Sequence, residues 1–99
     1  MLVRLLHFLG KGKAMLFRVW AEDMNREGIE SIVGKEFDGF SLVNAKGYWK
    51  GIGESSLVIE VETSQSELPR IRSIAEQIKL TNSQESVMIQ ALQTESVFV

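Results

Sequence analysis

The order of hydrophobic periods along the chain is the feature that most constrains its fold. Residues 15–22 alternate between the two faces of an extended segment and are rich in strand-forming residues, which is typical of a half-buried strand. A segment with apolar residues at helical spacing follows. Two more strands, a second segment with helical spacing and a further strand then complete the order. The expected elements are strands at 15–22, 40–45, 56–62 and 87–92, a short edge strand at 97–99, and helices within 25–37 and 66–81.

The two helices are each expected to bury one apolar stripe. Asp23 and Asn25 are both suitable N-caps for the first helix, and Ser66 is suited to cap the second because Pro69 then falls in its first turn. The expected stripes are Ile29, Ile32, Val33 and Phe37 in the first helix and Leu68, Ile71, Ile74, Ala75 and Ile78 in the second.

This order predicts an α+β fold, specifically a ferredoxin-like βαββαβ arrangement. Right-handed crossovers give a four-stranded antiparallel sheet in the order 4-1-3-2, in which the central pair, strands one and three, is expected to be the one parallel pair. Both helices then cover the same face of the sheet, and the other face stays open. We expect this domain to span residues 14–99.

Residues 1–13 predict a short helical or irregular N-terminal appendage. All of their charges are positive, and their apolar run is far too short to cross a bilayer. The segment is interpreted as a docked appendage or as sequence upstream of a natural start at Met15. A third reading is an arm that tethers the protein to a membrane surface, although a membrane is not among the expected partners.

Composition excludes several kinds of chemistry in these 99 residues. The chain has no cysteine and one histidine, which excludes disulfides, thiolate metal sites and multi-histidine metal sites. A net charge of -2 gives no support for nucleic-acid binding. No phosphate-binding glycine loop, nucleophile elbow or H-E-x-x-H motif occurs. We therefore expect a cytoplasmic, non-enzymatic binding module with no cofactor and no catalytic residues.

The open sheet face is the leading candidate for an interaction surface. A half-apolar face seldom stays uncovered, so we expect contact with the N-terminal segment, a second copy or a host protein. An RNA-binding sheet would carry several aromatic residues among basic ones, whereas Trp20 here lies beside Glu60. The residues expected on this face are Leu16, Arg18, Trp20, Val43, Val58, Glu60 and Met88.

The glycine-punctuated hairpin at 47–54 supports an alternative function. Its side chains offer stacking surface, a hydroxyl, an ammonium and a carboxylate, which suit a small molecule or nucleotide, or a minor enzymatic activity in a pocket between two subunits. The same aromatic rings would otherwise cap the end of the core. The residues concerned are Tyr48, Trp49, Lys50 and Glu54.

Acidic residues suggest a second, weaker site. With the first and third strands parallel, four carboxylates would meet near the start of the fourth strand and could hold Mg²⁺ or Ca²⁺. The plainer interpretation is that they are solvated acids at loop ends. The residues are Glu22, Asp23, Glu62 and Glu85.

Three short runs resemble a pattern in small uncharacterised proteins of phages and other mobile elements. They are Gly47-Tyr48-Trp49-Lys50-Gly51, residues 54–60 (ESSLVIE) and Gln84-Glu85-Ser86-Val87, and the resemblance covers residues 15–92. The chain is also similar to a bacterial family of unknown function with a glycine-aromatic hairpin and a late Q-E-S-V strand. The resemblance implies the same fold and a mobile-element origin, and it implies no mechanism.

Overall fold

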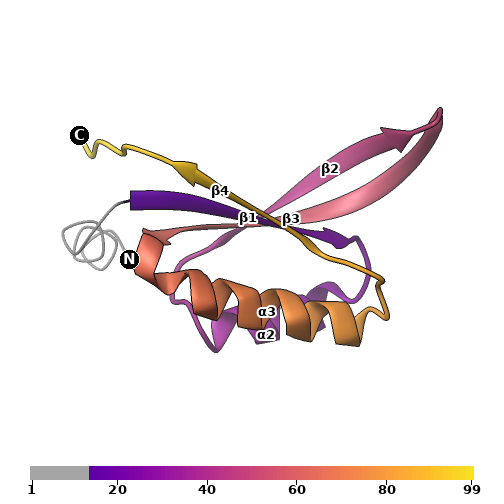
Figure 1. Ribbon diagram of the computed structural model, residues 1–99, viewed down its shortest axis with the longest axis horizontal. Helices are drawn as coiled ribbons and strands as arrows, with labels where there is room; N and C mark the ends of the chain where they lie inside the picture. The colour runs from indigo at the N-terminus through magenta and orange to yellow at the C-terminus, as the bar shows by residue number, and fades with distance from the viewer. Residues whose placement is uncertain (1–13) are drawn as a thin grey trace.

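A computed structural model describes residues 14–99, which form a four-stranded sheet with two helices against one of its faces (Figure 1). The α+β class and the open antiparallel sheet are confirmed. The appendage predicted over residues 1–13 lies outside the described residues. The elements in chain order are β1 (Ala14–Glu22), α2 (Arg26–Gly34), β2 (Ser41–Trp49), β3 (Ile52–Ser64), the 3-10 turn η1 (Gln65–Glu67), α3 (Leu68–Thr81) and β4 (Met88–Gln93).

The sheet has the strand order β2-β3-β1-β4, and every neighbouring pair is antiparallel. The expected order 4-1-3-2 names the same neighbours, counted from the β4 edge. The expected parallel pairing of β1 with β3 is wrong, because Leu16 lies opposite Glu62 and Glu22 lies opposite Ser56. The crossover through α2 returns β2 parallel to β1, and the β2–β3 hairpin then reverses the chain. This arrangement is compatible with a ferredoxin-like fold.

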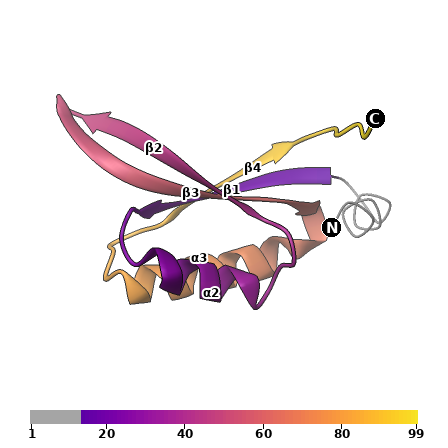
Figure 2. The same ribbon diagram turned by 180° about the vertical axis from the view of Figure 1, so that it is seen from behind.

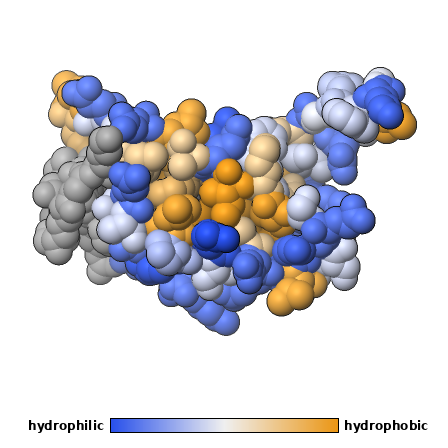
Figure 3. Space-filling model, viewed as in Figure 1, coloured by the Kyte–Doolittle hydropathy of each residue, from blue (hydrophilic) through white to orange (hydrophobic). Residues whose placement is uncertain are grey.

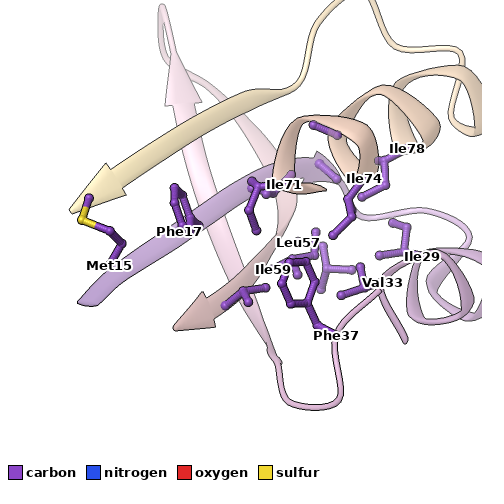
Figure 4. Packing of buried hydrophobic residues seen from close by; sticks show 14 residues of the cluster. Met15, Phe17, Ile29, Val33, Phe37, Leu57, Ile59, Ile71, Ile74 and Ile78 are labelled. Atoms are coloured by element: carbon purple, nitrogen blue, oxygen red, sulfur yellow. The ribbon is translucent and has the colours of Figure 1, made fainter. Parts of the chain in front are cut away.

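The hydrophobic core fills the space between one sheet face and both helices (Figure 4), and the view from behind shows both helices on the same side of the sheet (Figure 2). Every second residue of β1 is buried there, as its alternation predicts. The α3 stripe is confirmed except for Leu68, which is exposed because it lies at the very start of the helix. Phe37 reaches the core from the loop after α2, three residues beyond the end of that helix.

The β2–β3 hairpin extends well beyond the helix layer and projects from the body of the molecule (Figures 1 and 3). Both strands continue to a two-residue turn at Lys50 and Gly51, whose φ angles of 50° and 78° suit a type I′ turn. The strands expected at 40–45 and 56–62 therefore extend through the glycine-punctuated hairpin expected at 47–54 as far as this turn. Gly53 permits this pairing, since a Cβ there would lie 3.1 Å from the Tyr48 ring and 2.8 Å from the Lys46 side chain.

Three smaller expectations about element ends also need correction. Ser66 does not cap α3; its N–H donates to the Ser64 hydroxyl at 3.3 Å, which begins the η1 turn ahead of the helix. Asn25 does occupy the N-cap position of α2, but with a left-handed backbone and no side-chain cap. Residues 97–99 form no edge strand, because the ladder of β4 with β1 ends at Gln93.

Candidate functional site

One row of side chains crosses all four strands on the sheet face away from the helices. The register places Val58 between Val43 and Trp20, and Trp20 next to Met88. Val58 faces away from the core, because its neighbours in the strand, Leu57 and Ile59, point into the core. Val58 is nevertheless fully buried. The side chains at the two ends of the row remain accessible: Val43 is 38% and Met88 52% exposed.

Trp20 is held in place by side chains of the adjacent row on the same sheet face, which consists of Glu60, Arg18 and Gln90. Its indole Nε1–H donates to Gln90 Oε1 at 2.8 Å. The Arg18 guanidinium lies 5.1 Å from the centroid of the Trp20 ring, within cation–π range. Arg18 also forms an ion pair with Glu60, with Nε 3.2 Å from Oε2. The ring is therefore a half-buried, ordered apolar surface with its polar atom already satisfied.

A second apolar area lies at the Leu16 end of the same face. Leu16 is opposite Glu62 on one side and Leu92 on the other. The Ser96 hydroxyl donates to Glu62, so the segment after β4 returns toward β3. Leu92 is 44% exposed, which extends the apolar surface along the face.

Of the hairpin residues predicted to grip a ligand, Tyr48, Trp49 and Lys50 lie at the exposed tip of the hairpin. Tyr48 is 71% and Trp49 74% exposed. They are adjacent in a strand, so their rings lie on opposite faces of the hairpin and do not face a common ligand. Lys50 Nζ lies 5.9 Å from the Trp49 ring centroid. Glu54 pairs with Gly47 further along the hairpin.

Sequence reasoning missed Ile52 as part of this tip. It lies directly opposite Trp49 and is 72% exposed. The sequence could have indicated this position, because a two-residue turn at Lys50-Gly51 places residues 49 and 52 opposite each other across the hairpin.

The predicted cluster of four carboxylates is not formed, because β1 and β3 run antiparallel. Glu22 and Glu62 lie six positions apart along the ladder, a separation of about 20 Å. At the Glu22 end, the backbone N–H of Glu22 donates to Gln84 Oε1 at 3.1 Å. Within residues 14–99, no group of three or more histidine, cysteine, aspartate or glutamate residues is placed to hold a metal ion.

The structure adds a pocket of about 530 Å³ that the sequence did not indicate. It forms where β2 begins late: Ser41 pairs with Glu60, so the remaining residues of β3 face the loop after α2 instead of a strand. Four of its charged residues are acidic and two are basic. The lining residues are Leu16, residues 34–41, Glu60, Glu62, Thr63 and Arg70.

Arg70 fixes the loop that forms this pocket. Its Nη1 lies 2.6 Å from Glu67 Oε2, its Nε lies 3.4 Å from Glu36 Oε2, and Nη2 donates to the Glu36 carbonyl. The guanidinium carbon also lies 4.6 Å from the centroid of the Phe37 ring. The hydrogen bond to Glu67 raises the pKa of Arg70 despite partial desolvation, so the side chain stays charged.

We expect Arg70→Lys to destabilise the protein by about 1 kcal/mol, because an ammonium cannot make the forked contact or stack on Phe37 in the same way. The group is partly exposed, which keeps the effect small. Urea unfolding followed by circular dichroism measures it. An unchanged midpoint would show that the contacts of Arg70 contribute nothing to stability.

Comparison with family models and with curated proteins gives no match for this chain. Neither α2 nor α3 has the length and apolarity to cross a membrane, and the described residues contain no other α-helix.

Proposed function

We propose that the chain is a ferredoxin-like, non-enzymatic binding module that contacts a protein partner through its open sheet face. The observation that carries this proposal is the fixed position of Trp20 in an apolar row across the sheet. An anchor that is already ordered loses little conformational entropy on binding. Aromatic anchors of this kind often supply much of the binding energy of an interface.

The surroundings of Trp20 favour a protein surface over other partners. Val43 and Met88 extend the apolar centre, while the Arg18–Glu60 ion pair supplies polar groups beside it. This distribution follows the usual division of an interface into an apolar centre and a polar periphery. The ion pair is electrically neutral, so the face offers no positive surface for a phosphate backbone.

The hairpin is a weaker basis for function than the open face. Its aromatic rings point in opposite directions and enclose no common space for a small molecule. The cytoplasmic location and the resemblance to phage and mobile-element proteins stay predictions.

Met88→Glu tests the proposal with little effect on folding, because Met88 is already 52% exposed. The full chain and the variant are used as baits in a cross-linked host extract, and captured proteins are quantified by mass spectrometry. We expect Met88→Glu to reduce the capture of specific partners at least tenfold. Leu80→Glu is the matched control, since Leu80 is a 79% exposed apolar residue on α3. Equal capture by both variants would contradict a role for the open face.

A further inference from the structure

Strand β2 is an unpaired edge of the sheet. Among residues 14–99 its strand partner is β3 alone, and the order β2-β3-β1-β4 leaves its outer side free. It is nine residues long, has no proline and carries one charged side chain, Lys46. Sheet edges in soluble proteins are usually protected by charges, prolines, bulges or short strands. This edge has little of that protection.

The geometry of the turn determines which residues of β2 have backbone N–H and C=O groups that are not bonded to β3. In a two-residue hairpin the residues flanking the turn, Trp49 and Ile52, form a hydrogen-bonded pair. Antiparallel ladders alternate, so every second residue from Trp49 bonds to β3 and the residues between them direct N–H and C=O outward. The outward positions are Leu42, Asn44, Lys46 and Tyr48.

The two ends of the β2–β3 hairpin have complementary chemistry. The tip is aromatic and basic, with exposed Trp49 next to Lys50. The other end of β2 adjoins the pocket, which contains Phe37 and Phe40 and carries more acidic than basic groups. Ser41 and Trp49 are separated by eight residue steps, about 26 Å of strand.

We propose that two copies of this chain pair along β2, antiparallel and about a two-fold axis at Ala45, to form one continuous eight-stranded sheet. In this register each Ser41 lies opposite Trp49 of the second copy, and each Leu42 lies opposite Tyr48. The four outward residues of each strand then meet and make about eight backbone hydrogen bonds. Each hairpin tip packs at the partner pocket, with Lys50 beside its acidic residues.

A second copy fits this surface better than an unrelated strand does. A two-fold interface must be self-complementary, and β2 carries the basic aromatic tip at one end and the acidic apolar pocket at the other. Antiparallel pairing brings these unlike ends together twice. The pairing also joins the open faces of two copies, so that both Trp20 residues lie on one sheet surface.

The mass of the full chain in solution tests the pairing. Multi-angle light scattering and sedimentation equilibrium over a range of concentrations are expected to give about twice the 11.1 kDa of one chain. Lys46→Pro removes an outward N–H that β2 does not use within one copy, so the fold is expected to remain while the dimer dissociates. Circular dichroism checks the fold of this variant. Leu80→Glu is the control and is expected to stay dimeric.

Fluorescence of Trp49 reports whether the tip is covered. Trp20→Phe leaves Trp49 as the single tryptophan. Its emission is expected at shorter wavelength in this dimeric variant than in the monomeric double variant Trp20→Phe/Lys46→Pro. Equal emission wavelengths in a dimeric Trp20→Phe and a monomeric double variant would show that the tip is not packed against the second copy and would overturn the proposed register.

Three further results would overturn the proposed dimer. A protein that is monomeric at all concentrations has no such pairing. A dimer that survives Lys46→Pro and dissociates in Met88→Glu uses the open face. A monomer that floats with vesicles of phosphatidylcholine and phosphatidylserine binds a lipid surface in place of a second copy. These results do not depend on partner capture by Met88→Glu, so this inference and the proposed function can fail separately.

Discussion

Phe17→Ala is expected to lower the free energy of unfolding by about 3–5 kcal/mol. Phe17 is 1% exposed and lies on β1, which contacts both flanking strands and α3. Its opposite neighbours are Val61 on β3 and Ala91 on β4, and neither is large enough to fill the space that the ring would leave. The substitution therefore combines lost apolar burial with a cavity at the centre of the sheet.

The size of this effect is measured by urea unfolding at constant pH. Domains of this size are typically stable by about 5–15 kcal/mol, so the midpoint should fall strongly while the slope stays the same. Leu80→Ala is the matched control, because Leu80 is an apolar residue that is 79% exposed and should change stability by less than about 0.5 kcal/mol. Equal midpoints for the two variants would show that Phe17 does not pack as described.

The elements were predictable wherever one face of a segment is buried. In β1 every second residue packs on the helices, so the period of two in the sequence is the burial pattern itself. The same holds for α3, whose Ile71, Ile74 and Ile78 repeat at helical spacing and are fully buried. Phe37 shows the limit of this reasoning, since its spacing fits a helix although it packs from a loop.

Strand direction was harder to predict, and the error changed a predicted site. A half-buried strand alternates in the same way whether its neighbour is parallel or antiparallel, so the pattern of residues 56–62 does not indicate direction. Direction comes from the connections, and the tight hairpin at Lys50-Gly51 reverses the chain before β3. This reversal places Glu62 at the opposite end of the ladder from Glu22 and removes the proposed cation site.

The hairpin tip and the pocket depend on interactions between segments. The strands were expected to end at Ala45 and to begin again at Ser56, with a glycine-punctuated hairpin between them, but cross-strand packing of Tyr48 over Gly53 extends the ladder to the turn. The pocket exists because β2 stops pairing at Ser41 while β3 continues to Ser64. Unequal strand lengths across a hairpin leave no periodic signal in the sequence.

Trp20→Ala is expected to destabilise the protein by about 2–4 kcal/mol. This loss is somewhat smaller than the loss for a fully buried aromatic ring, because Trp20 is only half-buried. The indole lies beside Val58, which is fully buried on the open face and would become exposed. The hydrogen bond to Gln90 and the cation–π contact with Arg18 would also be lost. Thermal unfolding measures the change, and a loss below about 0.5 kcal/mol would show that the ring does not cover its neighbours.

Trp20→Phe separates the packing of the ring from its use as an anchor. Phenylalanine keeps most of the aromatic surface over Val58 and loses the hydrogen bond to Gln90, so its stability cost should be about 1 kcal/mol. A binding anchor depends on the position and full width of the indole. The captured amount of partner protein should therefore fall although the variant stays folded. If capture by Trp20→Phe matches that of the unaltered chain, the ring serves to cover Val58, and the centre of the contact surface lies at Met88 instead.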